Sequence, residues 1–410
     1  MSALAIIALS SSMLLSADWL TFRGADGNGK SPDTGLLKKW NTSGPKLLWQ
    51  VDFIGPGWSN VAIANDKLYI NGNVGDKSMV FCLDKDGNKI WEKDNGSAHT
   101  TARNYPGTRA TPTIDGDFVY DVSPLGETAC FNAKTGEKIW NKNLMTIYNA
   151  PMPMWFLGHS ALVDGDHLIC MVGGTKTLAV ALNKRTGEVV WESAPATGGE
   201  QTGYASPYLF ELEGLRVVVV ISKVTAEGLD PQTGKTLFSV PWRSSRDCHC
   251  TMPIYHNGHL FMTTGYDGGA AKLFKLTKNA DNTIKATEVW SEPRFNNHHG
   301  GVVLVGDHVY GTTHNGQWCS INFMTGEVGY LSRDAGKGSV HYADGLLYGL
   351  TENDRTVLLI KPESKEFVLL SSFELPNEAE GNSWAHPVVL DGRLYLRHAQ
   401  YLYCYDVKAE

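Results

Sequence analysis

Short apolar strands separated by polar turns recur along the 410 residues of this chain at intervals near 50 residues. Each clear repeat ends a strand in an apolar residue followed by Asp or Asn, then has a turn with glycine and an aromatic residue four positions after the glycine. These pairs are Gly87 and Trp91, Gly136 and Trp140, Gly187 and Trp191, Gly234 and Phe238, and Gly326 and Tyr330. Because one such unit cannot bury its own apolar faces, the period predicts a propeller or a solenoid.

A second mark gives the number of units. A strand follows an Asp-Gly or Asn-Gly type turn in each unit, and one aromatic or apolar residue of that strand marks its position. The marks are Tyr69, Tyr120, Ile169, Val219, Phe261, Tyr310, Tyr348 and Tyr395. Their spacings are 51, 49, 50, 42, 49, 38 and 47 residues. We therefore predict an all-β fold, an eight-bladed β-propeller of four-stranded antiparallel blades.

The two ends of the chain predict how the ring closes. After Tyr395, only the strand 401–406 remains, so the eighth unit lacks its outer strand. The segment 46–51, which contains Trp49, can supply that strand and leave no open sheet edge. We expect residues 46–410 to form one propeller domain, preceded by an N-terminal extension over 18–45.

Composition and the first residues bear on location and partners. The net charge of −7, with acids and bases scattered, argues against a nucleic-acid surface. Residues 1–17 resemble a signal peptide with apolar patches at 3–9 and 13–15, although the segment has no Lys or Arg. No other apolar run approaches the roughly 20 residues of a membrane span. These features predict a periplasmic or secreted protein without a transmembrane segment in its mature chain.

Two recurring residue types are expected to have structural roles. Cys82, Cys130 and Cys404 occupy the position that Ala181 fills in the third unit, where a small residue packs between sheets. The tryptophans of the outer strands are expected to dock one blade on the next. They are Trp49, Trp91, Trp140, Trp191 and Trp290.

The loops that lead into the inner strands carry the irregular and chemically reactive residues. Counting back 11 residues from the strand marks, with a longer count in the fourth unit because of an insertion near 211–213, gives one column of large side chains around the channel mouth. Two positions later, a second column is mostly small and polar and is expected to line a wet channel; it comprises Asn60, Thr111, Ser160, Ser206, Met252, Gly301, Ser339 and His386. From the columns and their neighbours we predict these ligand-binding residues: Trp58, Arg109, His159, Tyr204, His249, His298, His299, Lys337, Trp384 and His386.

Such a mouth can bind an anionic or aromatic ligand through stacking, cation-π contacts and charge-assisted hydrogen bonds. The alternative is a solvated mouth in which the aromatic residues only pack against loops. Neighbouring residues that would thicken the mouth are His99, Arg103, Tyr105, Trp155 and His341.

A metal site is a further candidate in the same region. Cys248-His249-Cys250 and His298-His299 lie on the loops of adjacent blades, and thiolate and imidazole are the ligands that zinc and copper prefer. The spacing matches no zinc knuckle, and the thiols could instead pair or stay buried. We therefore assign no metal to this cluster from the sequence and keep it as a candidate.

The repeat centred on Asn183, Thr186, Gly187 and Trp191 resembles the tryptophan-docking motif of the PQQ-like (quinoprotein-type) β-propeller repeat, and the resemblance extends from Trp49 to Asp406. The opening around Phe22-Arg23-Gly24 is similar to exported bacterial propellers of the quinoprotein-like or outer-membrane-assembly-like kind. The resemblance supports the fold strongly, whereas function varies widely among such proteins.

The resemblance implies two function classes. One is a PQQ-dependent alcohol or sugar dehydrogenase, with PQQ and calcium over the channel, a catalytic Asp and often a disulfide between adjacent cysteines. This chain has no Cys-Cys pair, and no acidic residue of the relevant face stands in a calcium motif; those residues are Glu127, Glu200, Asp247, Asp267, Glu352 and Asp354. The other class is a noncatalytic module that binds a small molecule or a protein, which we favour because it needs the fewest assumptions.

Overall fold

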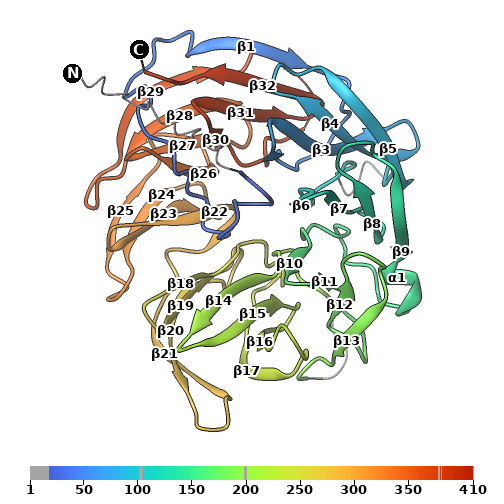
Figure 1. Cartoon of the computed structure of the whole chain (residues 1–410). Helices are drawn as coiled ribbons and strands as arrows, with labels where there is room; N and C mark the ends of the chain where they lie inside the picture. Colours follow the sequence, from blue (N-terminus) through green and yellow to red (C-terminus); the bar gives the residue numbers. More distant parts are fainter. Residues whose placement is uncertain (1–17, 101–104, 198–200, 377–378, 380, 410) are drawn as a thin grey trace, which may run out of the picture.

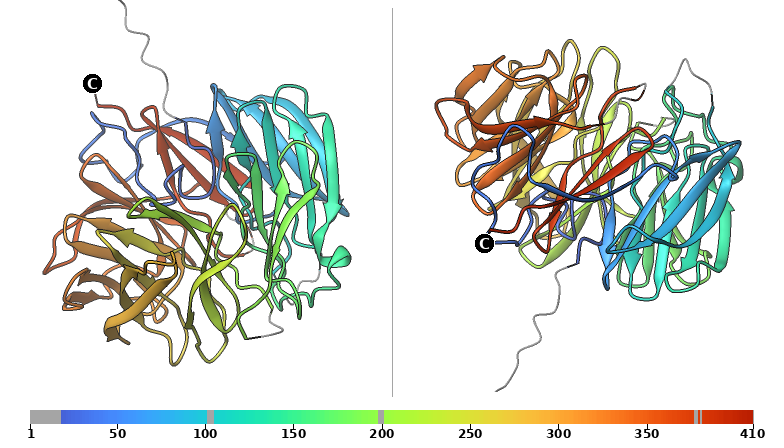
Figure 2. Two further views of the ribbon diagram at one scale, coloured as in Figure 1. Left: turned by 60° about the horizontal axis from the view of Figure 1, so that its bottom comes forward. Right: turned by 90° about the horizontal axis from the view of Figure 1, so that it is seen from above.

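Eight four-stranded antiparallel sheets surround one axis, as Figures 1 and 2 show. The computed structural model describes residues 18–100, 105–197, 201–376, 379 and 381–409. The predicted leader 1–17, Arg103 and Glu200 lie outside these residues. Within the described part the only helix is the short α1 (Leu144–Ile147), and no helix there could span a membrane. The predicted all-β fold with eight blades is confirmed.

Blades 1 to 7 take their strands in chain order from the axis to the rim, whereas blade 8 takes its outer strand from the N-terminal part of the chain. Blades 1 and 2 contain β2 (Ala62–Ala64), β3 (Lys67–Val74), β4 (Lys77–Asp84), β5 (Lys89–Ser97), β6 (Thr113–Asp115), β7 (Phe118–Val122), β8 (Glu127–Asn132) and β9 (Lys138–Asn143). Blades 3 and 4 contain β10 (Leu162–Asp164), β11 (His167–Met171), β12 (Ala179–Asn183), β13 (Val189–Ser193), β14 (Tyr208–Leu212), β15 (Leu215–Ile221), β16 (Thr225–Leu229) and β17 (Thr236–Pro241).

The second half of the ring repeats this order. Blades 5 and 6 contain β18 (Ile254–His256), β19 (His259–Thr263), β20 (Ala271–Lys278), β21 (Ile284–Glu292), β22 (Asn297–Val305), β23 (His308–Thr313), β24 (Trp318–Asn322) and β25 (Val328–Ser332). Blades 7 and 8 contain β26 (Gly338–Ala343), β27 (Leu346–Thr351), β28 (Thr356–Lys361), β29 (Val368–Glu374), β30 (Val388–Leu390), β31 (Arg393–His398), β32 (Tyr401–Asp406) and β1 (Lys46–Val51).

The ring closes as the sequence predicts. Strand β1 pairs antiparallel with β32, with Lys46 opposite Asp406 and Val51 opposite Leu402. The N-terminal strand thus supplies the rim of blade 8, and both ends of the propeller share one sheet. In Figure 1 the blue β1 lies beside the red β32.

The repeated tryptophan and glycine form the contact between neighbouring blades. The Trp191 indole Nε1–H donates to the carbonyl of Pro231 in the next blade at 3.0 Å. Gly234 of that turn has φ +72°, and a Cβ there would lie 2.5 Å from the Trp191 ring. Only glycine therefore lets the indole cover the turn. The docking role is confirmed, since the equivalent hydrogen bonds come from Trp49, Trp91, Trp140 and Trp290.

The cysteine column is also structural. Cys82, Cys130 and Cys404 are fully buried as free thiols, as is Ala181 at the equivalent position of blade 3. Each cysteine lies opposite an aromatic residue of a neighbouring strand in its blade. Cys130 of β8, for example, lies opposite Trp140 of β9. A small apolar side chain is what this space between sheets accepts, which confirms the packing assignment.

The N-terminal extension crosses the axis of the ring. Residues 18–29, here called the axial plug, pair with blade 1 through Trp19 and Ile63, and Thr21 bonds Thr113 of blade 2 at 2.8 Å. The buried Arg23 guanidinium then donates to the Val302 carbonyl of blade 6 and to His386 of blade 8. Figure 1 shows this blue segment entering the centre of the ring. The plug thus occupies the centre of the ring and lines a second cavity there.

The plug changes the environment of the small polar column. The column was expected to line a wet channel, but its members are buried and bond between blades. The Thr111 backbone N–H donates to Ser160 Oγ, and the Ser160 N–H donates to Ser206 Oγ, both at 2.9 Å. The column therefore does not line one open channel. Neighbouring inner strands bond to each other, and Ser160, Ser206 and Met252 of the column line a second cavity of about 290 Å³ beside the plug.

Arg397 ties blade 8 to blade 1 at the point of closure. Its fully buried guanidinium donates to the backbone carbonyls of Gly55, Ser59 and Asn71 at 3.0, 3.2 and 2.8 Å, and to Ser59 Oγ at 2.6 Å. Burial lowers the pKa of Arg397 to about 9, so the group stays charged at neutral pH. A planar fork of donors suits several fixed carbonyls better than a lysine ammonium does.

We expect Arg397→Leu to lower the free energy of unfolding by about 4 kcal/mol, because each buried carbonyl left unpaired costs about 1–3 kcal/mol. Urea unfolding followed by circular dichroism measures the change. Arg333→Leu is the control, since Arg333 is exposed and donates to one carbonyl, that of Asn315. A loss below about 1 kcal/mol for Arg397→Leu would contradict this role of Arg397 in closure.

Candidate functional site

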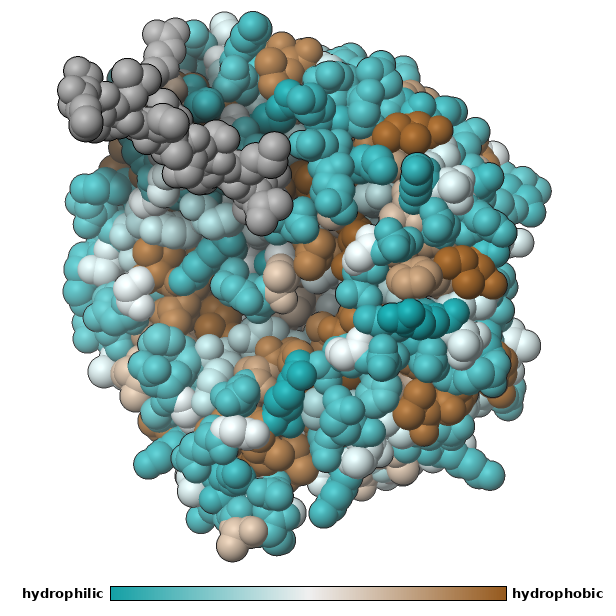
Figure 3. Space-filling model, viewed as in Figure 1, coloured by the Kyte–Doolittle hydropathy of each residue, from teal (hydrophilic) through white to brown (hydrophobic). Residues whose placement is uncertain are grey.

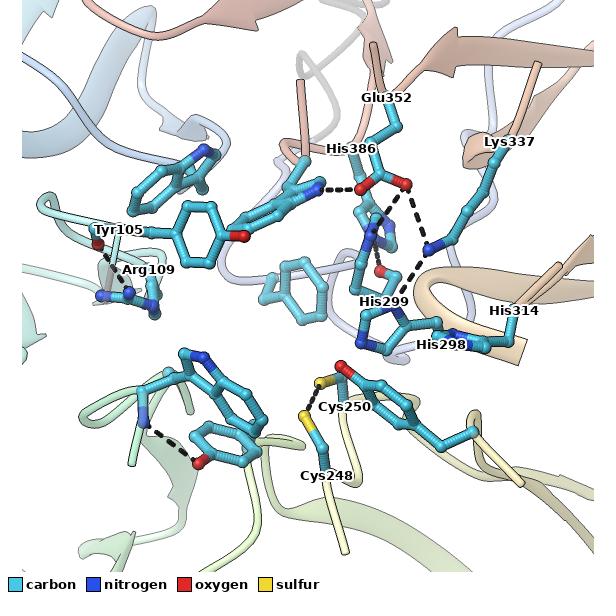
Figure 4. A pocket seen from close by; sticks show the side chains of 17 residues that line it. Tyr105, Arg109, Cys248, Cys250, His298, His299, His314, Lys337, Glu352 and His386 are labelled. Atoms are coloured by element: carbon cyan, nitrogen blue, oxygen red, sulfur yellow. Dashed lines mark hydrogen bonds and ion pairs between the residues drawn. The ribbon is translucent and has the colours of Figure 1, made fainter. Parts of the chain in front are cut away.

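A cavity of about 390 Å³ lies at one end of the axis, above the plug. Its walls come from the loops that lead into the inner strands and from the hairpins between the second and third strands of blades 5 to 7. Figure 4 shows these side chains converging from all sides. The face that the sequence singled out as irregular is therefore the face that carries the cavity.

Eight of the ten predicted ligand-binding residues line this cavity. The column that was counted back from the strand marks converges on one opening, so its alignment is right. The eight are Trp58, Arg109, Tyr204, His298, His299, Lys337, Trp384 and His386. Tyr105 and Trp155, expected as neighbours, line it as well.

The structure places His159 and His249 elsewhere. The ring of His159 is fully buried, and its Nε2 accepts the Met171 N–H at 3.3 Å. The ring of His249 lies 2.7 Å from Thr264 Oγ1 and 3.1 Å from the Lys223 carbonyl. Neither histidine lines the cavity, because each follows or precedes a lining residue by one position and its side chain points to the opposite side.

Besides Tyr105, Trp155, Gly158 and the two cysteines of the metal candidate, four lining residues were absent from the predicted set: Phe22, Tyr266, His314 and Glu352. Phe22 belongs to the plug and packs edge-on against His386 with ring centroids 4.9 Å apart. The other three stand on hairpins between second and third strands, which share a face with the predicted loops. Glu352 stood among the acidic residues of that face, and a count of hairpin positions could have found Tyr266 and His314 too.

Aromatic rings form one wall. Trp384 lies 5.1 Å from Trp58 and 4.9 Å from Tyr105, measured between ring centroids. The Arg109 guanidinium stands over the Trp58 ring at 5.0 Å and donates to the Tyr105 carbonyl at 2.7 Å. Burial lowers the pKa of Arg109 to about 10, which leaves it cationic at neutral pH. This wall offers stacking faces with a positive charge at their edge.

Lys337 and Glu352 form the polar side. The Lys337 ammonium lies 3.0 Å from one carboxylate oxygen of Glu352 and 2.9 Å from His298 Nδ1. The other carboxylate oxygen accepts the Trp384 indole N–H at 2.9 Å. Burial opposes ionisation of Glu352, but the contacts with His299, Lys337 and Trp384 together hold its pKa below the usual range. Glu352 is therefore a paired carboxylate (Figure 4).

The cavity histidines are neutral at pH 7. Burial, followed by the neighbouring His299 and Lys337, lowers the pKa of His298 well below its usual value. Burial likewise lowers the pKa of His299 and of His314, and that of His386 to about 3. Among the described lining residues, the charged side chains that face a ligand are then Arg109, Lys337 and Glu352, which together carry one net positive charge.

The donors present do not fit PQQ with calcium. Calcium requires six to eight oxygen ligands, usually several carboxylates. Glu352 is the only carboxylate residue among those that line the cavity in the described chain, and both its oxygens are engaged. The other donors are thiols, imidazoles and phenols, which are poor calcium ligands. We therefore assign no calcium-bound quinone to this cavity.

Comparison with known proteins gives the family. A family model described as outer membrane protein assembly factor BamB matches residues 7–148 and 126–369. No curated protein matches the sequence. Three solved structures that share the architecture are BamB from Moraxella catarrhalis, the computationally designed Ika8 protein, and the quinohemoprotein alcohol dehydrogenase ADHIIG from Pseudomonas putida HK5.

The structural likeness is broad and the sequence identity low. The BamB structure has 15% identity and a TM-score of 0.63 over 89% of this chain and 98% of its own. The Ika8 values are 9% and 0.60 over 89% and 100%, and the dehydrogenase values are 11% and 0.59 over 96% and 81%. These likenesses support the propeller fold alone. On the family match, the chain belongs to the family of PQQ-like β-propellers described as outer membrane protein assembly factor BamB.

Proposed function

We propose that this chain is an exported, noncatalytic binding module whose cavity holds a small planar organic anion. The observation that carries the proposal is the cavity itself, about 390 Å³ between an aromatic wall edged by Arg109 and a polar side formed by Lys337 and Glu352. Aromatic walls with a few placed polar groups are typical of small-molecule sites. Export rests on the apolar segments within residues 1–17.

The charges favour an anion. Lys337 already holds Glu352, so a ligand carboxylate would bind on the open side of the ammonium and share it. Arg109 provides the second cation beside the Trp58 ring. Neutral histidines add hydrogen-bonding groups without charge. A flat ligand can lie on the tryptophan faces while its acidic group points to Lys337.

The shape favours a small molecule over a macromolecule. Phe22 forms the floor, so the cavity ends at the plug and does not continue through the ring. On the face drawn in Figure 3, where the described atoms are visible, the surface is largely hydrophilic, and hydrophobic side chains stand in separate patches. Docking surfaces for proteins usually present a larger continuous apolar area. We therefore place the binding site in the cavity rather than on the face drawn in Figure 3.

Noncatalytic binding is favoured over a quinoprotein dehydrogenase because the described residues that line the cavity include no free carboxylate to act as a base and no oxygen cluster for calcium. The test is a titration of the mature protein with PQQ, used as a planar aromatic tricarboxylate, with calcium and with EDTA. Thermal shift reports binding, since a ligand of the native state raises its stability. A dye-linked alcohol and sugar oxidation assay runs on the same samples.

We expect PQQ to bind equally well in calcium and in EDTA, without turnover. Trp290→Phe is a matched control, because Trp290 lies on the rim and should leave binding unchanged. Calcium-dependent binding with turnover would instead support the dehydrogenase. Absence of any shift would contradict the proposed anion site.

A further inference from the structure

The thiols of Cys248 and Cys250 meet at the edge of the cavity. Their sulfurs lie 3.5 Å apart in the loop between β17 and β18, and both line the cavity. The residue between them points away: the His249 ring contacts Thr264 Oγ1 and the Lys223 carbonyl. The His249 carbonyl accepts the N–H groups of Tyr204 and Ala205, each at 2.9 Å. The loop is thus held from behind, with both sulfurs presented to the cavity.

His298 completes a three-ligand group from the next blade. One ring nitrogen of His298 and the two sulfurs all lie within 4.8 Å of one another. Two thiolates at about 2.3 Å from one tetrahedral ion would be about 3.8 Å apart, close to the sulfur separation found here. In Figure 4 the His298 ring stands between Lys337 and the two cysteines. Little movement would bring all three donors onto one ion.

We propose that Cys248, Cys250 and His298 bind one thiophilic d10 cation, Zn²⁺ or Cu⁺, at the wall of the cavity. Thiolate and imidazole are the donors that these ions prefer. The metal site shares His298 and the cavity wall with the site for the organic anion, but its two thiols are donors that an organic anion does not need. Three protein donors would leave a fourth position on a tetrahedral ion, for a ligand from the cavity that all three residues line.

The surroundings suit such an ion. Two thiolates with Cu⁺ carry one net negative charge, which Lys337 and Arg109 would balance, and with Zn²⁺ they are neutral. The Lys337 ammonium donates to His298 Nδ1, and it also lies 3.0 Å from a Glu352 carboxylate oxygen. If His298 binds a metal and no longer accepts from Lys337, the ammonium would still be paired with Glu352. A metal-ligating histidine commonly depends on such neighbours for its orientation.

The test uses the full mature chain, reduced and handled without oxygen. Zn²⁺ is titrated against a fluorescent zinc chelator, and Cu⁺ against bicinchoninate, so the two arms identify the ion. Cys250→Ser is the variant, because Cys250 is partly exposed and should tolerate the change. Cys130→Ala is the matched control, since Ala181 fills the equivalent place in blade 3.

We expect one equivalent of one ion, weakened by about 100-fold or more in Cys250→Ser and unchanged in Cys130→Ala. In wild type, the bound ion should also protect Cys250 from iodoacetamide, a readout that needs no variant. Binding of equal strength in Cys250→Ser, or alkylation of Cys250 unaffected by either ion, would overturn the proposal. A reduced protein that binds neither ion and only forms a Cys248–Cys250 disulfide in air would overturn it as well.

Discussion

Acidification from pH 7 to pH 4 is expected to unfold the propeller, because three buried histidines are neutral hydrogen-bond acceptors. His159 accepts the Met171 N–H and His341 accepts the Val389 N–H, both at 3.3 Å, while His386 Nδ1 faces Arg23 at 3.2 Å. Burial lowers the pKa of His159 to about 4. Burial and then the charge of Arg23 lower the pKa of His341 and His386 to about 3.

The sign follows from proton uptake. Below about pH 6.5 the unfolded histidines bind protons that the folded ones do not, so stability is lost as pH falls toward the folded pKa values. Between pH 6.5 and pH 4, each histidine costs about 3 kcal/mol of stability at about 1.4 kcal/mol per pH unit. The three together reach the order of 10 kcal/mol, which is comparable to the whole stability of a domain.

One buried acid acts in the opposite direction. Burial raises the pKa of Asp121 to about 6, against the hydrogen bonds from Asn95 and Asn71. A raised pKa stabilises the fold as pH falls through about 6, by about 3 kcal/mol at most. Because three histidines oppose one aspartate, the histidines decide the outcome.

Far-UV circular dichroism against pH measures the acid midpoint. His159→Gln keeps an acceptor and cannot be protonated, so its midpoint should lie at lower pH than that of wild type. His256→Gln is the control, because His256 is exposed. A free energy of unfolding that stays constant between pH 6.5 and pH 4.5 would show that these histidines are not neutral acceptors in solution.

Lys337→Met is expected to weaken binding of naphthalene-2-carboxylate, a planar aromatic anion, by about 30-fold. The change removes the ammonium that would meet the carboxylate. It also leaves Glu352, now 3.0 Å from Lys337 Nζ, as an unpaired negative charge in the cavity. The loss therefore combines a missing charge-assisted hydrogen bond with repulsion.

A second substitution separates the two causes. Lys337→Met with Glu352→Gln should recover affinity to within about 10-fold of wild type, because the repulsion is gone. Lys365→Met is the matched control, a surface lysine paired with Glu327 at 2.6 Å. Isothermal titration in EDTA at constant salt measures all four proteins. If the double variant binds no better than Lys337→Met, repulsion by Glu352 plays no part.

The fold could be predicted because its repeated contact is local and periodic. The indole of Trp191 bonds the Pro231 carbonyl 40 residues later, and Gly234 of the same turn leaves room for its ring. The tryptophan and the glycine of one repeat contact therefore mark both the outer strand of one blade and the turn of the next blade. The closing strand 46–51 was predictable for the same reason, because the last unit lacked its tryptophan strand.

The sequence predicted which loop positions line the cavity, but it did not predict the direction of each side chain. Counting from the strand marks placed Trp58, Arg109 and Trp384 correctly, since equivalent loops end at equivalent places. It could not decide which of two adjacent histidines faces inward. His298 and His299 both line the cavity because the strand register shifts between Asn297 and Val302, an irregularity that residue types do not reveal.

The plug was beyond prediction because its contacts are long-range and unrepeated. Arg23 reaches His386, 363 residues away, and this approach needs Gly301, where a Cβ would lie 2.6 Å from the His386 ring. Nothing in the repeat marks this glycine as the one beside a guanidinium. The floor of the cavity therefore appears only in the folded chain.

The most direct test of the account compares two ligands of one shape. Naphthalene-2-carboxylate and the neutral naphthalene-2-carboxamide are titrated calorimetrically into the wild-type mature protein in EDTA at low salt. We predict one site per chain, with the carboxylate bound at least about 10-fold more tightly than the amide, as one charged hydrogen bond requires. Equal affinity for the two, or no heat from either, would contradict a cavity built for a planar organic anion.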